Sequence, residues 1–270
     1  MGIGGITIVA SSGMDGAHGI TDDFCQSTTM NPFYPAASPW VTAIGSTMIR
    51  AQDAVTAVGY AAPACASHTV GCLAGGTQVV QALDQPSEAT SGGGFSVYSV
   101  RPTWQDAAVT AYLETPSNQP PPTSFMPANR GYPDVSFLGN RYLVHFDSDM
   151  VASSGVVSIH VGAAIFGAIN SERAIFALPL IGFVNPLLYQ MAVDHPAAFM
   201  DITIGQNDCT AQTCTNCLGL KATAGWDAAT GLGSINWVEF VLNMAGVHNV
   251  TTSEGLARIE ELKEFRDARL

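Results

Sequence analysis

The order of apolar and polar positions divides much of the chain into short alternating strands and helices. Residues 3–10 form a nearly continuous apolar run, which predicts a fully buried parallel strand because helices would cover both of its faces. Residues 41–47 and 142–146 are further apolar runs of strand length. Pro102 suits the first turn of a helix extending to about Leu113, since that position needs no amide hydrogen.

Three later segments are predicted to be helical. Residues 162–170 are small or apolar on every side, and a helix that is apolar all round has to be buried. Residues 185–191 predict another short helix. From Ser253 onwards we expect an amphipathic terminal helix, either docked onto the domain or a partner, or left as a solvated tail. Its apolar positions recur every three or four residues, at Leu256, Ile259, Leu262 and Phe265.

Strands that alternate with helices indicate an α/β fold. We expect a three-layer domain around a mostly parallel sheet, whose ligands bind where loops leave the carboxyl ends of the strands. The Gly- and Ser-rich turn at residues 11–16 follows such a strand end. With 270 residues and 47% hydrophobic content, the chain can bury one large core. We therefore predict one domain over residues 1–247 and a terminal helix or tail over residues 248–270.

Charge and hydropathy exclude two classes of partner. The net charge is -12, which argues against a nucleic-acid partner. The most apolar stretch, residues 175–193, is interrupted by Pro179 and Pro186, so no membrane segment is expected. The residues after Met1 lack the basic stretch and long apolar run of a signal peptide. We expect a monomer.

The six cysteines favour disulfides over a metal centre. Zinc would need a second cysteine pair at the spacing of Cys214 and Cys217, and Cys65 and Cys72 are too far apart for that role. Disulfides indicate a secreted or lysosomal protein. Which of the six cysteines, including Cys25 and Cys209, bond to one another cannot be deduced from spacing. Residues 52–88 are expected to form a surface excursion closed by a disulfide, or else a plain loop.

Six short segments occur in the order that is typical of one peptidase family. They are Gly-Ile-Thr-Ile-Val-Ala-Ser-Ser-Gly at 5–13, Phe-Tyr-Pro-Ala-Ala-Ser-Pro at 33–39, Ser-Gly-Gly-Gly-Phe-Ser at 91–96, Arg-Pro-Thr-Trp-Gln at 101–105, Tyr-Pro-Asp-Val at 132–135 and Gly-Trp-Asp at 225–227. Together they resemble the sedolisin family of serine-carboxyl peptidases, and its tripeptidyl-peptidases in particular. The resemblance covers about residues 2–244. It implies a subtilisin-like three-layer fold that is truncated at its N-terminus, and a serine-type peptidase acting on proteins and peptides at acid pH.

The resemblance also implies catalytic machinery from which this chain departs at three places. Met14 stands where the family has the aspartic acid that stabilises the oxyanion, and methionine has no proton to donate. Val157 stands where the family has its serine nucleophile. The family's catalytic glutamate and its partner aspartate lie upstream of the segment matched by residues 5–10, and this chain does not contain them. We therefore assign no catalytic residue, because loss of a nucleophile or its base removes several orders of magnitude in rate.

Neighbouring residues offer poor replacements for the missing groups. Ser158 comes one place late, so its hydroxyl would project roughly 100° around the helix from the required direction. His160 is two positions further and faces another way. Asp15 would serve the oxyanion only if the turn shifted by one residue. Ser158 and His160 are therefore interpreted as structural residues.

A calcium site near the end of the domain is the second implication of the resemblance. Asp201 and Ile202 match an Asp-Val pair that ligates calcium in the family, and Gly225 to Asp227 match its Gly-Trp-Asp. Thr223 occupies a backbone-carbonyl position. Two carboxylates, the carbonyls of Ile202, Thr223 and Gly225, and water supply the six or so oxygens that calcium prefers. Without the resemblance, Asp201 and Asp227 would be ordinary turn and cap residues.

Two functions from different classes follow. The first is a sedolisin-type serine peptidase, acting on peptide or protein substrates, that is catalytically degenerate in this form. The second is a non-catalytic, calcium-stabilised protein that binds peptides or a protein partner. A nucleotide site is not expected, because residues 91–96 lack both the glycine spacing and the lysine of a phosphate-binding loop.

Overall fold

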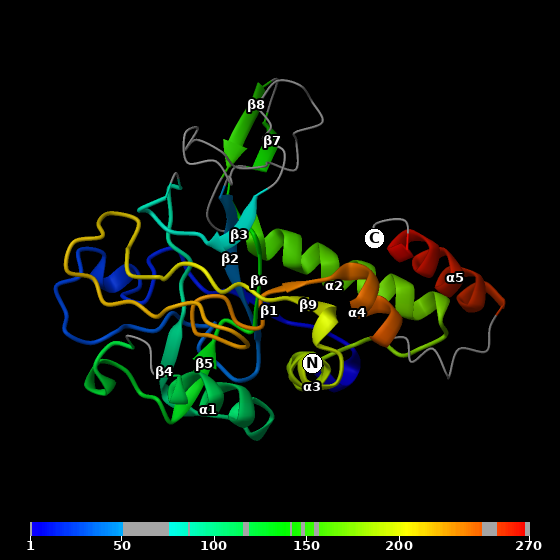
Figure 1. The fold of residues 1–270 in the computed structure, drawn as a ribbon, viewed down its shortest axis with the longest axis horizontal. Helices are drawn as coiled ribbons and strands as arrows, with labels where there is room; N and C mark the ends of the chain where they lie inside the picture. Colours follow the sequence, from blue (N-terminus) through cyan, green and yellow to red (C-terminus); the bar gives the residue numbers. More distant parts are fainter. Residues whose placement is uncertain are drawn as a thin grey trace.

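The computed structural model describes residues 2–50, 76–85, 87–115, 119–140, 142–146, 149–153, 157–244 and 253–267. Its centre is a mostly parallel sheet, and the long helix α2 (Val157–Ile175) packs against the sheet and extends beyond it toward α5 (Figure 1). No helix in these ranges combines the length and the apolar character needed to cross a bilayer. The predicted surface excursion lies mostly outside the described residues, and Cys65 and Cys72 lie wholly outside them.

The sheet is built around β2 (Thr42–Arg50). Three strands pair with it: β1 (Val9–Ser11), β6 (Val135–Leu138) and β3 (Thr77–Val80). Ile44 pairs in parallel with both Ser11 and Val135, which places β1 and β6 on opposite sides of β2. The antiparallel β3 follows β1 on the same side, because Thr47 pairs with both Val80 and Leu138. The predicted strand at residues 41–47 and the mostly parallel α/β sheet are confirmed.

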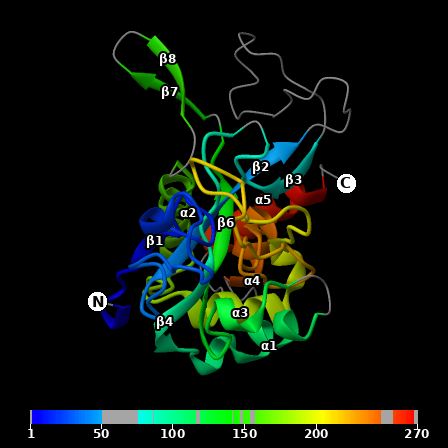
Figure 2. The ribbon, with the colours of Figure 1, turned by 90° about the vertical axis from the view of Figure 1, so that its left-hand side faces the viewer.

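Three two-stranded antiparallel ladders surround this sheet. They are β4 (Gly94–Val100) with β5 (Asn129–Tyr132), β7 (Tyr142–Phe146) with β8 (Asp149–Ser153), and β9 (Phe199–Met200) with β10 (Ser234–Ile235). The β7–β8 hairpin projects from the body in both views (Figures 1 and 2). The strand predicted at residues 142–146 is β7.

The remaining helices cover the ends and sides of the sheet. They are α1 (Asp106–Glu114), α3 (Asn185–Asp194), α4 (Trp237–Met244), α5 (Ser253–Asp267) and the 3-10 turns η1 (Gly2–Gly4), η2 (Ile20–Asp22), η5 (Thr103–Gln105), η6 (Pro122–Ser124) and η7 (Pro196–Ala198). The helix predicted after Pro102 is confirmed as η5 followed by α1. The short helix predicted from Asn185 is α3.

The buried strand predicted for residues 3–10 is wrong over most of its length. Its first residues form η1, and only Val9–Ser11 pair with β2. Gly5 has a φ of 80°, a left-handed conformation that ends any extended run. The side chains of Ile3 and Ile6 are exposed rather than buried. The apolar residues by themselves are typical of a strand, but Gly4 and Gly5, which lie between Ile3 and Ile6, favour a turn.

The prediction that residues 162–170 are buried all round is also wrong. Helix α2 buries Phe166 and Ile169 against the sheet, whereas Ala163 and Gly167 on its other side are exposed. Gly162 lets the helix approach closely, because a Cβ there would lie 2.5 Å from Ile44 Cδ1. On the sheet side of α2, the small Gly162 allows close packing. On the solvent side, the small residues Ala163 and Gly167 expose little apolar surface.

The terminal helix α5 docks onto its own chain, beside α4 and the end of α2 (Figures 1 and 2). Ile259 and Leu262 are buried in a cluster with Val241 and other apolar side chains of α4. Arg258 donates two hydrogen bonds to Glu172 of α2, from Nε to Oε2 at 3.0 Å and from a terminal nitrogen to Oε1 at 2.7 Å. The solvated-tail alternative is therefore wrong for residues 253–267.

A buried polar network joins the sheet to the surrounding elements. Asp134 and Arg130 are fully buried, and a terminal nitrogen of Arg130 lies 2.6 Å from Asp134 Oδ2. The same carboxylate accepts hydrogen bonds from Ala43 N at 2.8 Å, Tyr189 Oη at 3.1 Å and Asn185 Nδ2 at 3.3 Å. These donors come from β2, β5 and α3. The carboxylate therefore fixes the relative positions of three elements.

We expect removal of one partner in this network to destabilise the whole fold. Arg130→Met should lower the free energy of unfolding by about 3–5 kcal/mol, because it leaves Asp134 as a buried charge without its cation. Lys263→Met is the matched control, since Lys263 pairs with Glu260 on the exposed side of α5 and should cost less than about 1 kcal/mol. Urea denaturation measures both values, and equal losses would contradict the role assigned to the network.

Candidate active-site and metal-binding region

The turn at residues 11–16 leaves the carboxyl end of β1, where the sequence predicted a ligand-binding edge. Ser12 N donates to Ile44 O at 2.9 Å, which keeps the start of the turn on β2. Met14 O accepts from Thr90 N at 2.9 Å, and Gly16 N donates to Thr90 O at 3.2 Å. Backbone bonds to both neighbouring segments therefore set the position of Met14, the residue predicted to stand where the family has its oxyanion aspartic acid.

The glycine segment that follows Ser91 lies between this turn and the loop after Trp226. A Cβ on Gly92 would lie 1.9 Å from Ser12 O, and a Cβ on Gly93 would lie 2.0 Å from Ala228 O. Neither distance is sterically possible for a methyl group. The two glycines thus allow the 11–16 turn and the loop that contains Ala228 to pack against the same stretch of backbone.

Helix α2 begins at Val157, and residues 154–156 lie outside the described residues. Ser158 is only 2% exposed, so a peptide cannot reach its hydroxyl without movement of the helix. His160 is exposed on another face of α2. Ser158 is therefore buried while His160 faces solvent on a different side of the helix, as the helical spacing predicted.

Asp15 is held away from the role of an oxyanion residue. Its Oδ1 accepts a hydrogen bond from Ala211 N at 3.1 Å. Ala211 belongs to residues 209–219, hereafter the disulfide loop. That loop carries one disulfide within itself, Cys209–Cys214, and a second to the segment after the turn, Cys25–Cys217. The predicted preference for disulfides over zinc is confirmed at these four cysteines.

The five residues predicted to hold calcium meet around one turn. Gly225 N donates to Asp201 Oδ2 at 2.9 Å, and Thr223 N donates to Asp227 Oδ2 at 3.1 Å. Asp227 is fully buried, and its Oδ1 also accepts from Ala229 N at 2.9 Å and Thr230 N at 2.8 Å. Both carboxylates are therefore attached to the same short segment, 223–227, although 26 positions separate them in the sequence.

The electrostatics of this turn fit a cation. Burial raises the pKa of Asp227 to about 8, although hydrogen bonds from Thr230, Ala229 and Thr223 oppose the shift. Among the described residues, no Lys, Arg or His side chain forms an ion pair with Asp227. Thr223 Oγ1 is buried without a hydrogen-bond partner. A buried carboxylate without a countercharge and an orphaned oxygen beside it are features that a hard cation would satisfy.

Such an ion would depend on backbone oxygens. The described ranges contain no group of three or more His, Cys, Asp or Glu side chains placed to hold a metal. Two carboxylates with the carbonyls of Ile202, Thr223 and Gly225 form an oxygen set of the kind that calcium accepts.

Sequence reasoning missed one buried cluster in this region. His18 lies between Asp22 Oδ2, at 2.7 Å from its Nδ1, and Leu218 N, at 2.8 Å from its Nε2. The i,i+4 spacing of His18 and Asp22 was visible in the sequence, but such pairs are common by chance. The third member lies 200 positions away, so only the folded chain reveals the cluster.

We expect the close contact between Gly92 and Ser12 O to contribute to the stability of the fold. Gly92→Ala should lower the free energy of unfolding by about 1–3 kcal/mol, because the added methyl group overlaps Ser12 O. Gly167→Ala is the matched control, since no atom lies within 4 Å of its added Cβ and alanine stabilises a helix interior by up to about 1 kcal/mol. Thermal unfolding of both variants measures the difference. A Gly92→Ala protein as stable as the parent would contradict the proposed packing.

Comparison with known proteins places these features in a family. No protein-family model matches the chain. It is 41% identical over 234 residues to physarolisin of Physarum polycephalum, covering 85% of this chain and 40% of that protein. It is 34% identical over 238 residues to tripeptidyl-peptidase 1 of Dictyostelium discoideum, covering 88% and 33%. The human tripeptidyl-peptidase 1 is 30% identical over 241 residues, covering 86% and 36%.

The fold agrees with these relatives. The structure superposes on Pseudomonas sedolisin, a serine-carboxyl proteinase solved with two molecules of pseudo-iodotyrostatin, with a TM-score of 0.61 and 22% identity. The superposition covers 90% of this chain and 55% of the solved one. The chain thus spans a third to two fifths of the length of the curated relatives named here. It belongs to the sedolisin family, with the subtilisin-like α/β fold that the sequence predicted.

Proposed function

We propose that this chain is a sedolisin-family protein that retains the peptide-handling fold and a calcium site but does not hydrolyse peptides in this form. Val157 and its neighbour Ser158 carry the proposal. Val157 has no nucleophilic atom, and the adjacent hydroxyl is buried at the start of α2. Homology to peptidases supports a peptide or protein as the molecule that the fold handles. The two disulfides support a secreted or lysosomal location.

The oxyanion side of the mechanism supports the same conclusion. A tetrahedral intermediate needs donors aimed at its developing negative charge. Met14 has none, and the carboxyl group of Asp15 is directed at Ala211 N.

A specific surface supports the alternative, a non-catalytic peptide-binding protein. A pocket of about 390 Å³ lies beside β4 and is lined in part by Tyr34, Trp40 and Tyr98, whose side chains are exposed. Strand β4 continues directly from the glycine segment after Ser91, and among the described strands only β5 pairs with it. Its open edge and the aromatic pocket together suit an extended peptide.

Calcium would be held by Asp201 and Asp227 with the carbonyls of Ile202, Thr223 and Gly225. The ion would supply the positive charge that the buried carboxylate of Asp227 lacks. We therefore assign it a structural role in keeping the 201 and 223–227 segments together rather than a chemical step.

A cleavage assay tests the proposed loss of activity, and a binding measurement tests the alternative. At pH about 4 with calcium, where a carboxylate base can act, the parent chain should release no product from a peptide library, and Ser158→Ala should behave identically. Ser171→Ala, an exposed serine further along α2, is the matched control. Isothermal titration with the same peptides should still show binding. Cleavage that is lost in Ser158→Ala and kept in Ser171→Ala would overturn the proposed loss of activity.

The raised pKa of Asp227 predicts how pH and calcium change stability. Because the native carboxyl group holds its proton up to about pH 8 and the unfolded one only to about 3.8, the metal-free protein should lose stability as pH rises from 4 to 8. Calcium binds the ionised carboxylate, so its stabilising effect should grow over the same range. At 100 times its Kd, calcium should add about 2.7 kcal/mol at pH 8.

Differential scanning calorimetry with and without a chelator measures both effects. Asp227→Asn should abolish the calcium response and flatten the pH dependence of the metal-free protein. Asp194→Asn, an exposed carboxylate bonded to Gln190, is the control and should change neither. A calcium response that persists in Asp227→Asn would exclude the proposed ligand set.

A further inference from the structure

Two basic side chains of this acidic chain have no acidic partner. The sequence holds 10 Lys and Arg against 22 Asp and Glu, so most basic groups can find a carboxylate. Most Lys and Arg side chains in the described part of the chain form an ion pair or a hydrogen bond with another residue: Arg101, Arg130, Arg173, Arg258 and Lys263. Among these described side chains, Arg50 and Lys221 are the two that form neither. Both line the same pocket, which has a volume of about 440 Å³.

Arg50 reaches the pocket from the end of β2. In the antiparallel β2–β3 ladder Met48 pairs with Val79 and Arg50 pairs with Thr77. Side chains two positions apart on a strand share a face, so Arg50 and Val79 lie on the same face of the ladder. Val79 is buried, whereas Arg50 is exposed. The stem of Arg50 can therefore lie along apolar surface while its guanidinium group stays in contact with solvent.

Lys221 reaches the pocket from the base of the disulfide loop. Segments 205–207 and 220–222 run antiparallel, with Gln206 opposite Lys221. Two backbone hydrogen bonds, of 3.0 and 3.1 Å, join the segments on either side of this pair. Lys221 is half-buried, and its own carbonyl oxygen accepts a hydrogen bond from Tyr112 Oη at 3.3 Å. The backbone of Lys221 is thus fixed by bonds to two neighbouring parts of the chain.

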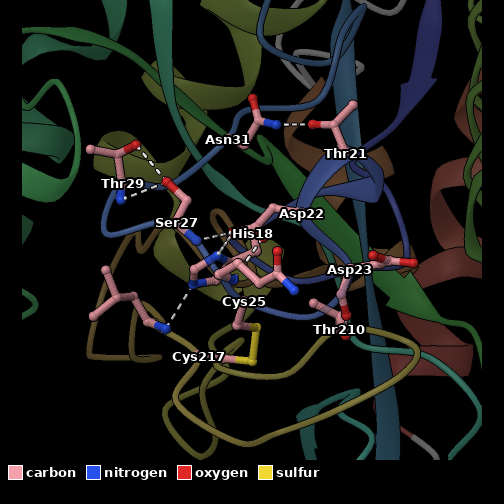
Figure 3. A network of polar contacts seen from close by, with 12 residues as sticks. His18, Thr21, Asp22, Asp23, Cys25, Ser27, Thr29, Asn31, Thr210 and Cys217 are labelled. Atoms are coloured by element: carbon pink, nitrogen blue, oxygen red, sulfur yellow. Dashed lines mark hydrogen bonds and ion pairs between the residues drawn. A yellow bond between two sulfur atoms is a disulfide. The ribbon is translucent and has the colours of Figure 1, made fainter.

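The disulfide loop between these segments is fixed as well. The Cys25–Cys217 disulfide links it to the segment after the 11–16 turn (Figure 3). Thr210 Oγ1 donates a hydrogen bond to Asp23 O at 2.5 Å beside this link. The base of the loop is also attached to the sheet, because Val80 N donates to Ile204 O at 3.0 Å. The pocket is therefore formed before any ligand arrives, which reduces the entropy that binding would cost.

One carboxylate lines the same pocket. Asp84 is exposed, and its side chain forms no ion pair or hydrogen bond with another residue in the described part of the chain. The nearby Asp208 accepts a hydrogen bond from Gln206 Nε2 and so already has a partner. The lining of the pocket therefore holds two positive charges and one negative charge. A ligand with a single negative charge would neutralise it.

The residues around these charges favour an organic anion. A guanidinium group can bind a carboxylate through two parallel hydrogen bonds, and an ammonium group adds a further charge-assisted one. The side chains of Val80 and Ile204 give the pocket apolar surface, which suits the body of an organic molecule. A phosphate group carries nearly two negative charges at neutral pH, so Asp84 would oppose it more strongly than it opposes a carboxylate.

We propose that this pocket binds a small organic carboxylate. Arg50 and Lys221 bind the carboxylate group, and Asp84 accepts a hydrogen bond from an N–H group of the ligand. The carboxylate can come from the C-terminal end of a peptide or from an acidic side chain, since the chemistry is the same. The pocket uses none of the five residues of the proposed calcium site. The proposal does not depend on whether the chain cleaves or binds peptides elsewhere.

An NMR titration of the full chain, with its disulfides intact and the calcium concentration held constant, tests the site. The probe is N-acetyl-alanyl-alanine, which has a free C-terminal carboxylate, and its C-terminal amide is the matched control. The carboxylate should shift the backbone amide signals of residues 203–206 and 221–222. The amide should bind at least about tenfold more weakly, the loss expected when a hydrogen-bonded charged group is removed. N-acetylglutamic acid α-amide carries the carboxylate on a side chain, so its affinity relative to the probe identifies the preferred source.

Two variants test the residues assigned to the carboxylate. Arg50→Met and Lys221→Met each remove one positive charge but keep an apolar stem. Each should weaken binding of the probe at least about tenfold, the effect of losing a hydrogen bond to a charged group. Lys263→Met is the matched control, because Lys263 is paired with Glu260 on α5, and it should bind the probe like the parent chain.

Four results would overturn the proposal. One is the absence of shifts at residues 203–206 and 221–222 up to the solubility limit of the probe. Another is equal binding of the carboxylate and its amide. The third is inorganic phosphate binding as tightly as the probe, and the fourth is unchanged binding in both Arg50→Met and Lys221→Met. The first three are measured on the parent chain and do not require any variant to fold.

Discussion

The fold depends on one buried ion pair, Arg130 with Asp134. A carboxylate in an apolar interior is costly unless donors surround it, and here they come from β2, β5 and α3. The Cζ of Arg130 lies 5.5 Å from the centre of the Trp104 ring, which encloses the pair on another side. Because the donors belong to three elements, none of these elements can shift without leaving the charge unsatisfied.

The same residue connects the core to the turn at residues 223–227. Asp134 O accepts from Leu232 N at 2.8 Å, and the neighbouring Pro133 O accepts from Trp226 Nε1 at 3.0 Å. Trp226 precedes Asp227 directly. Gly92 and Gly93 bring the 11–16 turn and Ala228 together. The regions that the resemblance assigns to the family's site are thus positioned by a buried charge and by the absence of side chains.

The buried carboxyl group of Asp227 links the stability of its turn to pH. Burial favours the protonated, neutral form of the Asp227 carboxyl group. In the absence of a cation, mild acid therefore stabilises the folded turn around it. Asn207 and Leu220, joined by two hydrogen bonds of 2.7 and 3.1 Å, close the base of the disulfide loop beside this region.

The sequence alone determined the family, the α/β class, the strands at 41–47 and 142–146, and the helices after Pro102 and at Asn185, because short motifs and local periodicity carry that information. It also identified the residues that gather around Asp201 and Asp227, since the resemblance extends over both segments. It could not determine which face of α2 is buried or how residues 3–10 run, because both depend on how closely other elements approach. Disulfide pairing, the position of α5 and the contacts of His18 and Asp134 were decided only by the tertiary structure. Cys25 and Cys217 are 192 positions apart, and His18 and Leu218 are 200 apart, so no local pattern records which distant backbone amide or sulfur a side chain will meet.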